Sequence, residues 1–264
     1  MLVMVAGLEF TVDAESGIAR LMFNRPEKHN AITFEMWQAI PDVVATVESD
    51  PAVKILQLTG AGGSFSAGAD VGEFRQLRAE PADAARYDEA VLGAVRALHD
   101  MVKPTVAVIQ GNCIGGGCQI AVACDLRFAA FRSRFGITPA KLGIVYDFES
   151  TRQLVSLIGP AHARYLLLSA ELLDARRARE IGLVNEVFDA DELPSAADRF
   201  AATIAGRSQS SVRGMNRIIN KISAGQREAD DEVHQIRLSA LTGEDYAEGV
   251  AAFLERRPPR FTFR

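Results

Sequence analysis

Residues 111–118 have the sequence Gly-Asn-Cys-Ile-Gly-Gly-Gly-Cys, a glycine-rich loop between two segments of different character. The apolar run Thr105–Ile109 before the loop suits a buried strand, and residues 119–124 after it suit a short helix. A strand, a glycine loop and a helix in this order are typical of strands that are covered by helices. This stretch therefore predicts an α/β fold.

The same alternation extends through the first part of the chain. Residues 18–23 and 53–58 suit strands, residues 81–99 suit a polar helix, and residues 126–129 suit a further strand. Thr33 is a candidate N-cap for a helix whose apolar side chains recur at helical spacing, namely Met36, Trp37, Ile40, Val43, Val44 and Val47. Because crossover helices cover parallel strands, we expect an α/β core over residues 1–190.

The character of the sequence changes after Ser150. Residues 154–158, 161–169 and 175–181 suit helices, and residues 183–188 suit a last short strand. From Asp191 onward almost every segment fits an amphipathic helix. We therefore expect a C-terminal α-helical region over residues 191–264.

Composition and charge exclude several classes of protein. The chain of 264 residues has a net charge of −5, which provides no positive surface for nucleic acid, and its apolar runs are too short to span a membrane. Residues 1–10 lack the basic-then-apolar pattern of a secretory signal, so we expect a cytoplasmic location. Cys113, Cys118 and Cys124 lack metal-ligand spacing and nearby histidines, so we expect small buried residues and no metal site.

Several short segments stand out along the chain. They are 24–26 (Asn-Arg-Pro) with 30–31 (Asn-Ala), 65–70 (Phe-Ser-Ala-Gly-Ala-Asp), 103–107 (Lys-Pro-Thr-Val-Ala), 111–118, 123–127 (Ala-Cys-Asp-Leu-Arg), 178–187 and 253–258 (Phe-Leu-Glu-Arg-Arg-Pro). In this order, and over essentially the whole sequence, the set resembles the crotonase (enoyl-CoA hydratase/isomerase) family. The resemblance implies a ClpP/crotonase-like fold with a spiral β-β-α core, a helical region at 191–264 that forms homotrimers or pairs of trimers, and an acyl-CoA substrate.

The resemblance gives two of these segments a chemical role. It implies that the backbone N–H groups of Ala69 and Gly116 form an oxyanion hole, which stabilises the negative charge of an enolate on the thioester oxygen. Glycine and alanine suit such donors because they keep side chains out of the way. Alone, each segment would more often be a simple strand-to-helix turn. A phosphate-binding loop is disfavoured because residues 115–119 lack a Gly-Lys-Ser/Thr ending.

Further positions match the family's contacts to coenzyme A, which is part of the substrate and not a separate cofactor. A solvated turn is an alternative interpretation of the Lys28 and His29 side chains. Arg256 matches a basic position that can reach the coenzyme A of a neighbouring subunit, and by itself is a cation in the last turn of a helix. The matching positions are Lys28, His29, Ala31, Ala67, Ala69, Asp70, Val71, Gly116 and Arg256.

The two glutamates that hydratases of the family use as general acid and base are absent. Their positions hold Gln119 and Pro139, and an amide does not carry protons near neutral pH. Residues 138–146 (Thr-Pro-Ala-Lys-Leu-Gly-Ile-Val-Tyr) are instead locally similar to methylmalonyl-CoA decarboxylase, which favours decarboxylation of a small malonyl-type thioester. Tyr146, assisted by Thr138, would then orient the leaving carboxylate or protonate the enolate. Ala69 departs from the decarboxylase pattern, which has a histidine there.

Several of these positions have alternative interpretations. Tyr146 also suits packing beneath its loop, and Asp147 suits a helix N-cap better than the nucleophile of the dehalogenase branch. Glu149 either faces the site as an isomerase-type base or points to solvent. The alternatives to decarboxylation are an enoyl-CoA hydratase or isomerase that uses a surrogate acid or base, and a catalytically silent acyl-CoA-binding homologue.

Overall fold

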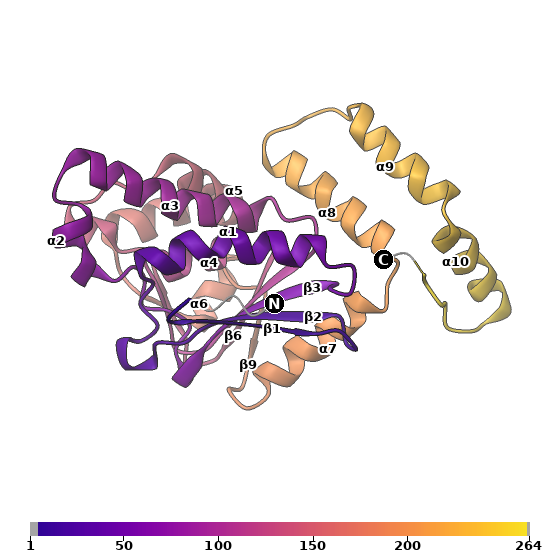
Figure 1. Ribbon diagram of the computed structural model, residues 1–264, viewed down its shortest axis with the longest axis horizontal. Coiled ribbons are helices and arrows are strands. Elements are labelled where there is room, and N and C mark those ends of the chain that lie inside the picture. Colours follow the sequence, from indigo (N-terminus) through magenta and orange to yellow (C-terminus); the bar gives the residue numbers. More distant parts are fainter. Residues whose placement is uncertain (1–4, 263–264) are drawn as a thin grey trace.

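The computed structural model describes residues 5–262, and its largest sheet has six strands (Figure 1). β1 and β2 form an antiparallel pair, and the other neighbouring pairs are parallel. Parallel neighbours require crossover connections, which the helices supply. In spatial order, the strands are β1 (Leu8–Asp13), β2 (Ile18–Phe23), β3 (Ile55–Gly60), β4 (Thr105–Ile109), β6 (Leu126–Ala130) and β9 (Glu186–Phe188).

A second, three-stranded sheet contains β5, which follows β4 in the chain, β7, which follows β6, and β8, which follows α5. β5 (Asn112–Ile114) pairs in parallel with β7 (Arg134–Gly136), and β7 pairs antiparallel with β8 (Leu173–Asp174). The chain passes from β4 to β5 at Gly111, where φ is +59° and a Cβ would lie 2.3 Å from the Gly63 carbonyl oxygen. Only glycine fits there. Two successive strands in different sheets, followed by a helix, give the predicted β-β-α core.

Helices cover both faces of the large sheet. Successive strand residues point to opposite faces. In β4, Ala107 therefore belongs to the larger apolar core, which α1, α3, α4 and α5 cover, whereas Val106 belongs to a second core beneath α7. The five helices are α1 (Phe34–Ser49), α3 (Pro81–His99), α4 (Gly116–Ala123), α5 (Phe148–Ser169) and α7 (Leu193–Ala205).

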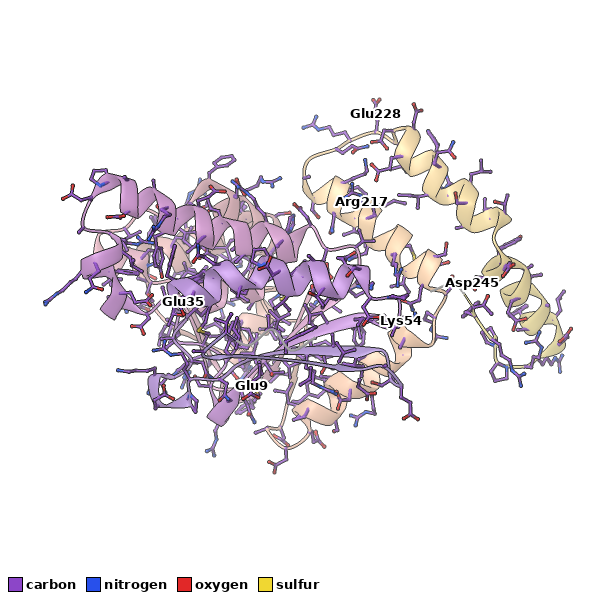
Figure 2. All side chains as sticks on the ribbon, in the orientation of Figure 1. Glu9, Glu35, Lys54, Arg217, Glu228 and Asp245 are labelled. Carbon is purple, nitrogen blue, oxygen red and sulfur yellow. The ribbon has the colours of Figure 1, made fainter. Side chains whose placement is uncertain are left out.

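The chain after α7 forms an arm that projects from the α/β core (Figure 1). α8 (Gln209–Ser223) lies against the core, where Asn220 donates a hydrogen bond to the His99 carbonyl oxygen at 3.1 Å. α9 (Asp231–Thr242) and α10 (Glu244–Glu255) extend further, and their side chains reach into space that the rest of the chain does not fill (Figure 2). The helical region predicted for 191–264 thus divides into α7, which packs on the sheet, and the arm, α8–α10.

Most long elements begin and end close to their predicted limits. The N-cap at Thr33 is confirmed, and the Cys113, Cys118 and Cys124 side chains are buried as expected. Most of the elements that the sequence did not predict are short ones, which show no recognisable period. The exception is β1, whose six residues alternate apolar and polar side chains and could have been predicted as a strand. The unpredicted elements are β1, β5, β7, β8, α2 (Phe74–Leu77) and the 3-10 turns η1 (Pro26–Lys28), η2 (Ala61–Gly63), η3 (Val71–Glu73) and η4 (Pro139–Leu142); the predicted helix at 175–181 is α6 (Ala175–Glu180).

None of the helices within residues 5–262 has the length and apolar composition needed to cross a membrane.

Candidate active site

A cavity of about 220 Å³ opens between α1, α3, the start of α4 and the loops at 67–71 and 138–147. Much of its wall is apolar, with Phe74, Val91 and Ile144 among the contributing side chains. A largely apolar cavity with a few polar groups is typical of a small-molecule site. Its polar side chains include Arg78, Tyr87, Gln119, Thr138, Tyr146 and Asp147.

The loop that contains Ala69 is fixed by hydrogen bonds to the start of α1. Ile32 donates its N–H to the Gly68 carbonyl oxygen at 2.7 Å, and Asp70 donates its N–H to the Ile32 oxygen at 2.8 Å. Because the groups on both sides of Ala69 bond to Ile32, the N–H of Ala69 points away from Ile32. The Ala69 nitrogen lies near the first residue of α4.

Glycines allow this loop and the start of α4 to approach each other. Gly115 has φ 54° and ψ −121°, a conformation that favours glycine. A Cβ on Gly116 would lie 3.3 Å from the Ala69 amide nitrogen and 2.8 Å from Trp37 Cζ2. A Cβ on Gly68 would lie 3.2 Å from the Gly116 nitrogen. The backbone amides of Ala69 and Gly116 are therefore neighbours at the cavity wall.

Both amides can donate to a ligand. Within residues 5–262, neither N–H takes part in the backbone hydrogen bonds that hold these loops in place. Gly116 is the first residue of α4, and the first N–H groups of a helix have no intrahelical acceptor. The helix also places partial positive charge at this end. Such a pair of donors is suited to stabilising an oxyanion.

Gln119 lies in the first turn of α4 and is held by two hydrogen bonds. Its Nε2 donates to Asp147 Oδ2 at 3.0 Å and to Ser150 Oγ at 2.8 Å, which leaves its carbonyl oxygen for a ligand or a water. The other Asp147 oxygen accepts the Ser150 N–H at 2.8 Å. Asp147 therefore caps α5, as the sequence predicted.

Thr138 and Tyr146 both lie in the cavity wall. Thr138 Oγ1 is next to the glycine turn, since a Cβ on Gly115 would lie 3.8 Å from it. The Tyr146 ring also packs partly against the apolar core. Desolvation of its phenol, reinforced by Cys118 and Asp147, holds the pKa of Tyr146 well above its ordinary value. Tyr146 is thus a neutral phenol that can donate a hydrogen bond.

Glu149 is not part of the cavity wall within the described chain. Its carboxylate accepts two hydrogen bonds from Arg96 of α3, at 2.7 Å from Nε and 2.5 Å from Nη2. These bonds lower the pKa of Glu149. The sequence left open whether Glu149 faces the site or points to solvent. Because its side chain lies away from the cavity, we give Glu149 no role in proton transfer.

Residues expected to contact coenzyme A gather at one rim of the cavity. Lys28 and His29 are exposed, and the His29 carbonyl oxygen accepts the Ala67 N–H at 2.9 Å. Ala67 and Val71 belong to the cavity wall, as do Ala69 and Gly116. The segments 28–31 and 67–71 are therefore adjacent.

Two other expected contacts are joined by a single arginine. Arg25 Nη1 donates to the Ala31 carbonyl oxygen at 2.7 Å and to Asp70 Oδ2 at 2.9 Å. Arg256, in contrast, follows α10 at the opposite end of the molecule from α2 (Figure 1). Within one chain it is far from this cavity.

Three polar side chains of the cavity wall were not predicted from the sequence. Trp37 and Tyr87 are completely buried, and Arg78 rests on the rings of Phe74 and Tyr87. Trp37 was predicted only as part of the apolar stripe of α1, because a hydrophobic pattern carries no information about an indole N–H. Arg78 follows a helix that is too short to be predicted. Only their convergence in space identifies them.

The chain is similar to known proteins over nearly its whole length. Residues 13–264 match the family model described as enoyl-CoA hydratase/isomerase. The chain is 35% identical over 255 residues to a crotonyl-CoA hydratase of Syntrophomonas wolfei, covering 95% of this chain and 96% of that protein. It is 29% identical to a peroxisomal Delta(3,5)-Delta(2,4)-dienoyl-CoA isomerase of Arabidopsis thaliana, covering 94% of each. A solved enoyl-CoA hydratase/carnithine racemase from Magnetospirillum magneticum has a TM-score of 0.93 and 30% identity, over 99% of this chain and 97% of that chain.

Proposed function

The chain belongs to the enoyl-CoA hydratase/isomerase family, and from this we propose that it binds an acyl-CoA thioester in the cavity and stabilises its enolate. The observation that carries the proposal is the close approach of the Ala69 and Gly116 amides. Two donors aimed at the thioester oxygen would stabilise the negative charge that develops there, and loss of one such donor costs about 3 kcal/mol of barrier. Coenzyme A enters as part of the substrate, with no separate cofactor.

The reaction that we propose is decarboxylation of a small malonyl-type thioester. The bond between the α-carbon and the carboxylate breaks, and its electron pair passes to the thioester as an enolate. The α-carbon then accepts a proton. Gln119 and Pro139 support this reaction, because they replace the two glutamates that hydration requires. Tyr146 supplies the hydrogen bond or the proton, and Thr138 assists.

Hydration or isomerisation of an enoyl-CoA is the second candidate. The names of two relatives, a crotonyl-CoA hydratase and a dienoyl-CoA isomerase, favour it. Tyr146 or Asp147 would then replace the missing acid or base. Both oxygens of Asp147 already accept hydrogen bonds, from Gln119 and from the Ser150 N–H, so proton transfer by Asp147 would require this network to open.

Purified protein should be mixed separately with malonyl-CoA, methylmalonyl-CoA and crotonyl-CoA. Release of carbon dioxide from either of the first two supports decarboxylation. Loss of the enoyl absorbance of crotonyl-CoA supports hydration and counts against decarboxylation. Binding of all three thioesters without turnover would favour the catalytically silent acyl-CoA-binding homologue.

A further inference from the structure

Part of the cavity wall carries hydrogen-bond donors that have no acceptor. The Trp37 Nε1, Arg78 Nε and Tyr87 hydroxyl atoms are buried, and none has a hydrogen-bond partner within residues 5–262. All three side chains line the same cavity. Because nearly all buried polar groups in proteins are satisfied, three such groups in one cavity point to a ligand that supplies the acceptors.

Trp37 and Tyr87 connect this group of donors to the oxyanion site. The Trp37 indole N–H lies close enough to the Tyr87 hydroxyl to favour its phenolate, although the two groups are not aligned as a hydrogen bond. Burial dominates and raises the pKa of Tyr87 to about 12, so its hydroxyl keeps its proton. The same edge of the indole meets Gly116, where a Cβ would lie 2.8 Å from Trp37 Cζ2, the ring carbon next to the one that carries Nε1.

The guanidinium of Arg78 is positioned by aromatic rings. Its Cζ lies 4.4 Å from the centroid of the Phe74 ring and 4.5 Å from that of the Tyr87 ring. Stacking on a ring uses the face of the guanidinium, so its in-plane N–H groups remain available to acceptors. Nη2 donates to Asp88 Oδ1 at 2.9 Å, and the Asp88 side chain is 61% exposed. Arg78 Nε has no acceptor.

We propose that Trp37, Arg78 and Tyr87 form a carboxylate subsite for the acyl group, so that the substrates are CoA thioesters of short dicarboxylic acids. The inference rests on the proposed function, because a thioester at the Ala69 and Gly116 amides directs its acyl group into this cavity. A cation and two neutral donors match a carboxylate, which offers about four lone-pair sites. An aliphatic end would leave the donors unsatisfied. The cavity volume of about 220 Å³ suits a short acyl group.

Matched pairs of thioesters test the subsite on the full chain. In each pair an isopropyl group replaces a carboxylate of similar shape: malonyl-CoA with 3-methylbutyryl-CoA, succinyl-CoA with 4-methylpentanoyl-CoA, and glutaryl-CoA with 5-methylhexanoyl-CoA. Trp37 is the single tryptophan of the chain, so stopped-flow quenching of its fluorescence reports binding before turnover. We expect at least one carboxylate thioester to bind at least about tenfold tighter than its isostere.

Variants separate recognition of the carboxylate from packing. Arg78→Gln should reduce the preference for the carboxylate thioester over its isopropyl isostere to about twofold or less, and it should leave the affinity for the isopropyl thioesters unchanged. Arg78→Lys should keep part of this preference. Asp88→Asn removes the carboxylate that competes for Arg78 and should increase the preference.

Two results would overturn the subsite. One is that no carboxylate thioester binds more tightly than its isopropyl isostere. The other is that Arg78→Gln weakens the binding of both members of each pair equally, which would show that Arg78 acts only through packing. Failure of the proposed function has a different signature, since no thioester in either series would then bind. That result would remove the subsite as well.

Discussion

Gly116 is the residue at which the backbone geometry and the proposed chemistry depend most directly on each other. In Gly116→Ala the added Cβ would lie 2.8 Å from Cζ2 of the buried Trp37 ring and 3.3 Å from the Ala69 amide nitrogen, so either the ring or the Gly116 backbone must move, and a shift of this backbone displaces one of the two donors. We expect kcat to fall by about 10²- to 10³-fold, the range for loss of one oxyanion donor. Steady-state kinetics on the active thioester measures the change.

Gly93→Ala is the matched control, because a Cβ at this position in α3 meets no atom within 4 Å. It should leave kcat unchanged and should stabilise the protein by at most about 1 kcal/mol. An unchanged kcat in Gly116→Ala would contradict the oxyanion assignment.

Gln119 occupies the position at which the resemblance to the family's hydratases implies a glutamate. In Gln119→Glu a second carboxylate would face Asp147 Oδ2, which Gln119 Nε2 now contacts at 3.0 Å. Repulsion between the two carboxylates raises the pKa of the pair in the folded state. The free energy of unfolding should therefore fall below that of the wild type as the pH rises above about 4.3, the unfolded pKa of glutamate. We expect a deficit of about 1–3 kcal/mol at pH 8 and a smaller one at pH 5, measured by urea denaturation.

The double variant Gln119→Glu/Asp147→Asn restores a donor opposite the new carboxylate and should recover most of the lost stability. If the deficit in Gln119→Glu were the same at pH 5 and pH 8, charge repulsion would not be its cause.

At the scale of elements, the sequence predicts what depends on local periodicity and capping. α3 begins and ends where its polar pattern indicated, at Pro81 and His99, and α1 begins directly after its Thr33 cap. β5 and β7 have three residues each, and their pairing is set by distant chain, so no local pattern reveals them. The candidate site shows the same limit of local patterns. Ala69 and Gly116 could be assigned from motifs that resemble the family. The proposed carboxylate subsite could not, because it forms only where α1, the end of α2 and α3 come together.

Lys103 joins two elements through a buried amine. Lys103 lies just before β4, and its Nζ donates to two carbonyl oxygens at the end of α1. The acceptors are those of Val47 and Asp50, both at 2.6 Å. Burial, with a contribution from Arg213, lowers the pKa of Lys103 to about 8. The unfolded state therefore binds an additional proton between about pH 8 and pH 10.4, and the contribution of Lys103 to stability rises with pH in that window by up to about 1.4 kcal/mol per unit.

Lys103→Met should lower the free energy of unfolding by about 1–3 kcal/mol at pH 7, because two buried carbonyl oxygens lose their donor. The difference from the wild type should widen at pH 10, as measured by denaturant titration. Lys28→Met, at an exposed position, should show no such widening. Parallel pH profiles for the wild type and Lys103→Met would mean that the amine does not titrate in this window.

At the scale of the whole molecule, the arm formed by α8–α10 is the part that a single chain does not explain. Phe253 and Leu254 on α10 are 83% and 74% exposed, and other apolar side chains of α9 and α10 are also exposed. Exposed apolar surface that is concentrated on one projecting element is typical of an interface. We propose that the arms pack against other copies of the chain, giving a homotrimer or a pair of trimers.

Assembly would also give Arg256 a function, because this residue follows α10 far from the cavity of its own chain (Figure 1). If the arm of one chain reaches the cavity rim of its neighbour, Arg256 can contact the phosphates of the neighbour's coenzyme A. We therefore expect Arg256→Gln to keep the wild-type mass by sedimentation equilibrium and to weaken acyl-CoA binding by about threefold to tenfold, the effect of one lost charge-assisted contact. The paired change Phe253→Glu with Leu254→Glu should produce monomers and the same loss of affinity, whereas Phe131→Glu, at an exposed phenylalanine between β6 and β7, should produce neither. Monomeric wild-type protein, or monomers that bind acyl-CoA as tightly as the assembly does, would show that each cavity is complete within one chain.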